Sequence, residues 1–202
     1  KRSIVLTLRS AAGRASLPRL IATADVVVDN FRPGVMAELG LDWPHLSALR
    51  PGVIHTSVTG FGEHGPYAGR PSFDFIAQAM SGFMSVNGRD GDAPMRAAMP
   101  ISDLVAGLYG AFGVACALVA RREGRVRGQR VESSMMNGLI SLMAYLSANY
   151  LATGQLPPRT GNEHPIAAPY GLYRASDGEV AIAPSTDDVV RRLFRALGIE
   201  RM

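Results

Sequence analysis

The chain has 202 residues, of which 47% are hydrophobic and 19% are charged, and its formal net charge is +4 at pH 7. This composition is typical of a soluble globular protein with one or two domains. The arginines are scattered apart from a cluster at residues 121–130, and no basic stripe contains interleaved aromatic residues. We therefore expect no nucleic-acid partner.

The N-terminal part of the chain alternates between predicted strands and helices. Apolar, β-branched runs predict strands at residues 3–8, 25–31 and 52–61, separated by segments with helical patterns. The second run is continuously apolar, which is typical of a strand covered by helices on both faces. The alternation predicts a parallel open sheet, where ligands bind beyond the carboxyl ends of the strands. The loops at 29–34 and 59–67 are therefore candidate binding segments.

From residue 72 onwards the pattern becomes mainly helical. We expect a helix from residue 73, a loop at 87–94, a long helix after Asp103 and a second one over about 132–151. A hairpin with its turn at Asp177-Gly178 and an amphipathic helix follow. The predicted fold class is α/β, with an open, mostly parallel, Rossmann-like sheet followed by long helices and the start of a small α+β domain. The predicted parts are a large domain at 1–154, a linker at 155–165 and the start of a small domain at 166–202.

The uncharged run from Leu104 to Ala120 is the only membrane-like segment. It falls at the low edge of the roughly 17–25 residues that span a bilayer, so no membrane partner is expected. Gly107, Gly110 and Gly113 are spaced three apart within it, and this spacing predicts a helix face that packs closely against its neighbours.

Asp103 is the first candidate for chemistry, because it begins this apolar run. Local rules favour a helix N-cap, since aspartate is among the best capping residues. Catalysis is the alternative, and one residue can do both. Amide groups at a helix N-terminus would lower the pKa of this carboxyl and keep it ionised, as a nucleophile must be.

The segment DNFRPG at residues 29–34 is the second candidate. It offers backbone donors, an aromatic face and a fixed cation, which together suit an adenine nucleotide with phosphates; a plain strand-to-helix turn is the alternative.

Asp74 and Glu132 are interpreted from their local pattern as capping or surface residues. The lone Cys116 excludes an internal disulfide, indicates a reducing compartment and is expected in the core. No histidine spacing indicates a metal site, and the N-terminal run has no signal-peptide pattern.

Taken in order, several segments resemble the class III CoA-transferases, which include formyl-CoA and carnitine CoA-transferases. The resemblance is carried by KRSIVLTL, ADVVVDNFRPGVMAELGL, VTGFGEHGPYAGRPSFDFIAQAMSG, MPISDLVAGLYGA, GQRVESSMMNGL and GNEHPIAAPYGLY. It implies a cytoplasmic enzyme that moves coenzyme A from an acyl-CoA donor to a small carboxylic acid without a metal. It also implies that Asp103 is the nucleophile and that the CoA site is formed by Asn30, Phe31, Arg32, Gly34, Arg70, Phe73 and Asp74.

The same resemblance leaves alternatives open. The α-methylacyl-CoA racemase branch carries a Gly-His-Asp sequence where this chain has Ser72-Phe73-Asp74, and a phenylalanine cannot move a proton. A non-catalytic CoA-binding paralogue is a further alternative, because family members have an additional N-terminal unit and continue beyond the point where this sequence stops. Family members form interlocked dimers, so a homodimer is expected. LSANYLATG and GNEHPIAAPY resemble the branch that uses succinyl-CoA and dicarboxylic acids such as glutarate.

Overall fold

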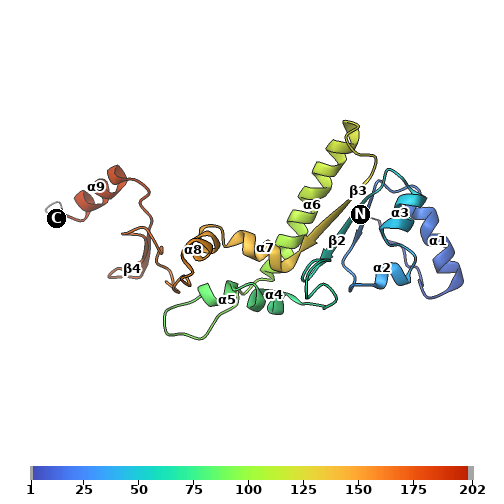
Figure 1. Cartoon of the computed structure of the whole chain (residues 1–202). Coiled ribbons are helices and arrows are strands. Elements are labelled where there is room, and N and C mark those ends of the chain that lie inside the picture. The colour runs from blue at the N-terminus through green and yellow to red at the C-terminus, as the bar shows by residue number, and fades with distance from the viewer. Residues whose placement is uncertain (1, 200–202) are drawn as a thin grey trace. The chain divides into compact units, whose positions relative to one another are not determined.

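The computed structural model describes residues 2–199. Two compact units are present, one from residues 2–83 and 96–148 and one from residues 84–95 and 149–199. The elements in chain order, shown in Figure 1, are α1 (Ala11–Ile21), β1 (Val26–Asp29), α2 (Val35–Glu38), α3 (Trp43–Leu49), β2 (Ile54–Thr59), α4 (Asp74–Met80), α5 (Phe83–Val86), α6 (Ile101–Arg122), β3 (Gln129–Ser134), α7 (Met135–Leu142), α8 (Tyr145–Thr153), β4 (Gly171–Arg174), β5 (Glu179–Ile182) and α9 (Asp187–Ala196).

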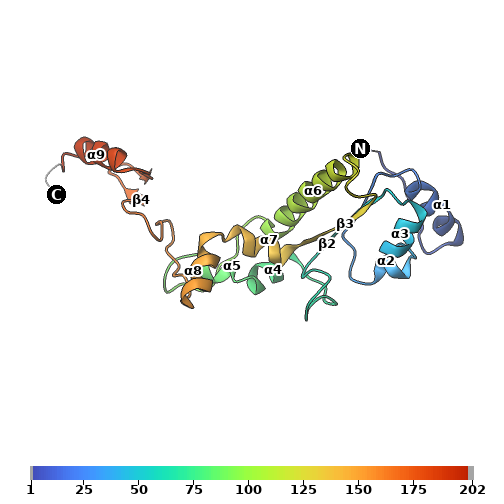
Figure 2. The same ribbon diagram turned by 45° about the horizontal axis from the view of Figure 1, so that its top comes forward.

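The first unit is built around a parallel sheet in the order β1-β2-β3, of which β2 and β3 are labelled side by side in Figures 1 and 2. Val28 of β1 pairs with Thr56 of β2, and Thr56 pairs in turn with Val131 of β3. The central strand β2 is buried along almost its whole length, because it has a strand on each side and helices on each face. The predicted α/β class with a parallel sheet flanked by helices is confirmed.

Helices cover both faces of this sheet. On one face, Val27 packs against a buried cluster supplied mainly by α1, α3 and their connections: Ile21, Leu41, Leu46 and Val53. On the other face α6 runs along β2 and β3 (Figure 1). A Cβ atom at Gly110 would lie only 3.6 Å from the Thr56 and Val58 side chains. Gly110 and Gly113 therefore bring the backbone of α6 close to the sheet, as predicted, whereas a Cβ atom at Gly107 would have no neighbour within 4 Å, so the predicted role of Gly107 is wrong.

The length and composition of α6 would suffice to cross a membrane, and it is the only helix among residues 2–199 of which this is true. Its buried residues Val105, Ala106, Gly110 and Ala117 lie on the side that packs within the unit. Cys116 is exposed on this helix, so its predicted core position is wrong. The reason is that the sheet takes up only one side of α6.

Two predicted elements need correction. Residues 3–8 do not form the predicted strand. Val5 is 92% exposed, and no described strand pairs with this segment, so its apolar pattern has neither a partner nor a covering layer.

Residues 129–134 are strand β3, although a helix was predicted from about residue 132. Pairing with β2 supplies hydrogen bonds to this segment and buries Ser133 and Ser134. The arginine cluster at residues 121–130 therefore spans the connection from helix α6 to strand β3. The helical part that follows is split into α7 and α8 at Ala144, whose φ is +43°.

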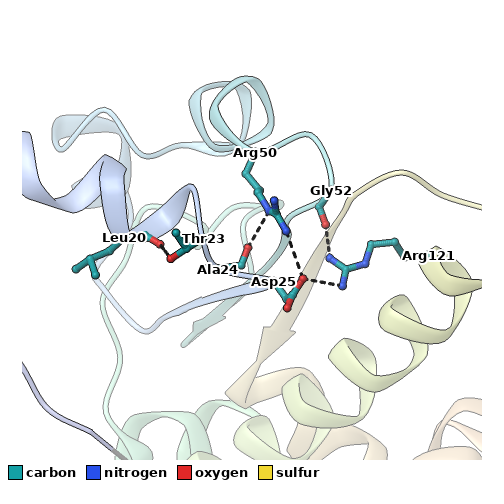
Figure 3. Close-up of polar contacts among 7 residues, drawn as sticks. All are labelled: Leu20, Thr23, Ala24, Asp25, Arg50, Gly52 and Arg121. Atoms are coloured by element: carbon teal, nitrogen blue, oxygen red, sulfur yellow. Dashed lines mark hydrogen bonds and ion pairs between the residues drawn. The ribbon is translucent and has the colours of Figure 1, made fainter.

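Arg121, in the last turn of α6, bonds to the segments that precede β1 and β2, and Arg50 adds further contacts to the segment before β1 (Figure 3). Arg121 donates to the carbonyl of Gly52 at 2.5 Å and pairs with Asp25 at 3.0 Å. Arg50 donates through Nε to the carbonyl of Ala24 at 3.2 Å and lies 3.5 Å from the Asp25 carboxylate. Residues far apart in the sequence are thereby fixed around the starts of β1 and β2.

The second unit contains the predicted hairpin. Strands β4 and β5 pair in antiparallel fashion, and Ala175 N–H donates to the Gly178 carbonyl at 2.8 Å across the turn. The two chain segments of this unit meet at a bridge between Arg89 and Thr160 and at a bond from Gly161 N–H to the Gly88 carbonyl. The predicted amphipathic helix that follows is α9.

Candidate active site

A cavity of about 790 Å³ lies at the carboxyl ends of β1 and β2, where a parallel sheet is expected to bind ligands. Its volume is within the range of small-molecule and cofactor sites. The residues that line it are Val28, Asp29, Asn30, Phe31, Arg32, Pro33, Val58, Thr59, Gly60, Arg70, Pro71, Ser72, Phe73, Asp103, Gly107 and Met135. All belong to the first unit, so this unit supplies both walls.

The loop after β1 forms one wall. Phe31 is 44% exposed and lines the cavity. Its backbone N–H donates to the carboxylate of Asp29 at 3.2 Å, which fixes the first turn of the loop. Gly34 ends the loop with a φ of +92°, a conformation that costs glycine little because it has no Cβ. The loop thus presents Asn30, Phe31 and Arg32 beside the cavity before α2 begins.

A buried polar group that the sequence analysis missed supports this loop. The Asp29 carboxylate lies 2.8 Å from Nε2 of His55 and accepts from the Ser57 hydroxyl at 3.4 Å. All three side chains are buried. Val27 pairs with His55 and Asp29 with Ser57, so alternate residues of two adjacent strands share one face. That register was the signal from which the group could have been found.

The opposite wall depends on a close approach at Gly60. A Cβ atom there would lie 2.3 Å from the Cβ of Ser72, so only glycine lets the segment before α4 lie against the end of β2. This segment carries Arg70, whose guanidinium stacks over the ring of Tyr67 at 4.7 Å. Phe73 follows and is 77% exposed. An arginine and an exposed aromatic ring therefore face the cavity from this side.

Asp103 lies in the first turn of α6, but it is not the helix cap. The N-cap position is Pro100, which makes no side-chain hydrogen bond. The carboxylate of Asp74 performs the capping role from α4, accepting from the Ser102 N–H at 2.9 Å and from its hydroxyl at 2.7 Å. The prediction that Asp103 caps its own helix is wrong, because another element supplies the acceptor.

The ionisation of Asp103 also differs from the expectation. The pKa of Asp103 is raised above its ordinary value. The larger cause is the partial loss of hydration at the cavity wall, and the smaller one is the negative charge of the nearby Asp74 carboxylate. A position at a helix N-terminus predicts a lowered pKa instead. Desolvation and a neighbouring like charge give a shift in the opposite direction.

The structure brings most of the predicted site residues together. Asn30, Phe31, Arg32, Arg70, Phe73 and Asp103 line the one cavity. Gly34 instead borders a smaller cavity of about 300 Å³, and the Asp74 side chain is engaged with Ser102. Glu132, interpreted as a capping or surface residue, accepts from the backbone N–H of Glu63 in the glycine-rich loop. Within residues 2–199, no group of three His, Cys, Asp or Glu side chains is arranged to hold a metal ion.

Comparison with known proteins gives consistent matches. The sequence model of CoA-transferase family III matches residues 1–202. The chain is 40% identical over 200 residues to a succinate–glutarate CoA-transferase of Agrobacterium fabrum, covering 98% of this chain and 50% of that protein. It is 37% identical over 199 residues to an acetyl-CoA:oxalate CoA-transferase of Acetobacter aceti, with 98% and 51% coverage.

Solved structures agree with these sequence matches. A CaiB/BaiF family protein from Brucella suis superimposes with a TM-score of 0.85 at 38% identity, covering 99% of this chain and 53% of that one. A hypothetical protein from Mycobacterium tuberculosis gives a TM-score of 0.86 at 25% identity, with 100% and 55% coverage. The chain spans about half the length of the curated relatives it matches.

Proposed function

The chain belongs to CoA-transferase family III, and from this premise we propose that its protein transfers coenzyme A from an acyl-CoA donor to a free carboxylic acid. The observation that carries the proposal is the shared cavity. A carboxylate with an exposed side chain, Asp103, lines the same cavity as Phe31, Arg32, Arg70 and Phe73. Coenzyme A is a substrate here, with an adenine ring, phosphates and a long flexible arm.

The cavity walls suit the parts of this substrate. Guanidinium groups form charge-assisted hydrogen bonds to phosphate oxygens, so Arg32 and Arg70 are assigned to phosphates. Exposed aromatic rings offer apolar contact area, so Phe31 and Phe73 are assigned to the adenine ring and the pantetheine arm. Asn30 and the loop amides complete the nucleotide wall, and Gly34 provides the turn that shapes it. Asp103 is assigned to the thioester because the family resemblance implies that it is the nucleophile.

The proposed chemistry is covalent catalysis by Asp103. A carboxylate oxygen of Asp103 attacks the thioester carbonyl of the donor; the C–S bond breaks, giving a mixed anhydride and CoA thiolate. The thiolate attacks the Asp103 carbonyl, releases the donor acid and leaves an aspartyl-CoA thioester. The acceptor carboxylate attacks this thioester, forming a second anhydride and again freeing the thiolate. Attack of the thiolate on the acceptor acyl carbon gives the new acyl-CoA and restores Asp103.

We further propose succinyl-CoA as donor and a dicarboxylic acid such as glutarate as acceptor. The relative from Agrobacterium fabrum is named as a succinate–glutarate CoA-transferase, and the segments LSANYLATG and GNEHPIAAPY favour the same branch. A homodimer and a cytoplasmic location are part of this proposal, the latter supported by the lone cysteine.

Trapping the aspartyl intermediate tests the proposed function. The full-length protein is incubated with succinyl-CoA and hydroxylamine, digested and analysed by mass spectrometry. We expect an aspartyl hydroxamate on the peptide that contains Asp103, formed only in the presence of donor. We also expect CoA transfer to glutarate to be lost in both Asp103→Ala and Asp103→Asn.

Two results would contradict this assignment. Transfer that persists in Asp103→Ala would remove Asp103 from the mechanism. Exchange of the α-proton of a 2-methylacyl-CoA, without transfer to any acid, would instead indicate racemase chemistry.

A further inference from the structure

A chain of partly buried hydrogen bonds holds the N-terminal end of α6. The Asp74 carboxylate accepts from the Ser102 N–H and hydroxyl through one oxygen and from Nε2 of Gln78, at 2.7 Å, through the other. Oε1 of Gln78 accepts in turn from the Ala97 N–H at 2.8 Å. Ser102 and Gln78 are fully buried. The arrangement thus fixes α4, the segment before α6 and the first turn of α6 to one another.

We propose that Asp74 is a positioning residue for the reaction at Asp103: it holds the helix end that carries Asp103 and keeps a negative charge beside it. This inference rests on the proposed function, since it assigns a role at the same site. It also places Asp74 outside the wall that contacts coenzyme A.

The capping geometry frees Asp103. A carboxylate at the third helical position can bond back to the backbone N–H of the N-cap residue, but the N-cap of α6 is Pro100, and proline has no N–H. Asp74 already accepts from the Ser102 N–H, and the side chain of Asp103 makes no hydrogen bond to any residue in the part of the chain that the structure describes. Its oxygens are therefore available at the cavity, on a helix end that is held in place.

The negative charge of Asp74 also favours reaction at Asp103. Two neighbouring carboxylates repel one another, and this repulsion disappears when Asp103 becomes an uncharged anhydride or thioester. The other charged side chains on the cavity wall are Asp29, Arg32 and Arg70. Asp74 therefore disfavours the free carboxylate of Asp103 relative to its acylated form, and makes it a stronger base and nucleophile.

The experiment compares the full-length protein with its Asp74→Asn variant in two measurements. The first is the titration of the Asp103 carboxyl by ¹³C NMR, which needs no activity. The second is the pH dependence of hydroxamate formation on Asp103 from succinyl-CoA. In Asp74→Asn we expect the Asp103 pKa to fall, because a like charge is removed. We expect trapping to slow by between about tenfold and a hundredfold, with its acidic limb moved to lower pH.

Three further variants separate the roles. Ser102→Ala keeps the charge of Asp74 but loses the 2.7 Å hydrogen bond, so trapping should slow without a change in the pH profile. Asp74→Glu is used if Asp74→Asn fails to fold. It keeps the negative charge and should leave the pKa of Asp103 raised. Ser10→Ala is the matched control, since Ser10 caps α1 by accepting from the Gly13 N–H at 3.0 Å. It should lower stability alone.

The result that overturns the inference is an Asp74→Asn variant whose Asp103 titration and trapping profile equal those of the wild type. Failure of the proposed function looks different. In that case the wild type forms no hydroxamate on Asp103, while its carboxyl titration still responds to Asp74→Asn.

Discussion

At the scale of single residues, Asp103 shows how a side chain is made available for chemistry. Local rules assign an aspartate in this sequence to a helix cap, yet Asp74 takes that role from another element. Asp103 stays exposed at the cavity, and its pKa is raised first by desolvation and then by Asp74. A carboxylate with these properties is less stable as an anion in the folded protein than in the unfolded chain.

This ionisation predicts a pH-dependent effect on stability for Asp103→Asn. The pKa of Asp103 is higher in the folded protein than in the unfolded chain, where it is about 3.9. Between these two pKa values the folded protein therefore binds more protons at this carboxyl than the unfolded chain does. The ionised side chain therefore lowers the free energy of unfolding at pH 7, and this loss disappears on acidification. We expect Asp103→Asn to be more stable than the wild type at pH 7 and equally stable near pH 3. Denaturant unfolding at both pH values checks this, and a variant less stable at pH 7 would contradict it.

A second residue-scale prediction concerns Phe73, which is exposed on the cavity wall. Phe73→Ala removes little buried area within the protein, so stability should change by less than about 0.5 kcal/mol. If the ring contacts coenzyme A, its loss should weaken CoA binding by about tenfold, as for truncation of an aromatic anchor. Isothermal titration with CoA measures this. Phe75→Ala, an exposed ring of α4 that does not line the cavity, is the control and should bind CoA normally.

At the scale of elements, α6 is a helix with two different sides. Gly110 and Gly113 face the sheet, where Cβ atoms would lie 3.6 Å and 2.6 Å from the nearest β2 and β3 side chains respectively. Gly107 has nothing within 4 Å of such an atom and lines the cavity. Three glycines with the same spacing therefore differ in what surrounds them.

Alanine at these positions should separate packing from helix propensity. Alanine favours a helix over glycine by about 0.5–1 kcal/mol, so Gly107→Ala should be neutral or stabilising. In Gly113→Ala the new Cβ meets the stiff, branched Val131, and overpacking typically costs about 1–3 kcal/mol. We expect Gly113→Ala to be the less stable of the pair by at least about 1 kcal/mol in denaturant unfolding. Equal stability would mean that α6 can move away from β3.

At the scale of the whole molecule, distant parts of the sequence meet at both ends of the parallel sheet. The carboxyl ends of β1 and β2 meet the start of α6 at the cavity. The opposite edge is tied by Arg121, which bonds to Asp25 and to the carbonyl of Gly52. At both ends of the sheet, α6 supplies residues beyond position 100 that contact or lie beside the N-terminal strands β1 and β2.

Removing the Arg121 contacts should lower the free energy of unfolding without changing the cavity at the other end of the sheet. Arg121→Ala leaves the partly buried Gly52 carbonyl without this donor, which typically costs about 1–3 kcal/mol. Arg122→Ala is the matched control on the next, exposed position of α6 and should change stability by less than about 0.5 kcal/mol. Thermal unfolding compares the two variants. An Arg121→Ala protein as stable as its control would show that the contact contributes nothing.

The sequence alone determined the features that depend on local pattern. Alternation and apolar runs predicted β1, β2 and their helices, and the Asp-Gly turn predicted the β4–β5 hairpin, because backbone preference and side-chain periodicity act over a few residues. The family resemblance indicated Asp103 together with the loop Asn30–Arg32. These residues line one cavity, although their roles remain predictions.

Only the tertiary structure decided what depends on a distant partner. Residues 129–134 are a strand because β2 offers a free edge to pair with, whereas residues 3–8 have the pattern of a strand but no described partner. The Asp29–His55–Ser57 group exists because two strands share a register. The pKa of Asp103 is raised first by desolvation at the cavity and then by Asp74, and Asp74, far away in the sequence, caps the helix in its place. Hydrogen bonds and charges act through space, and the chain order does not state which of them will meet.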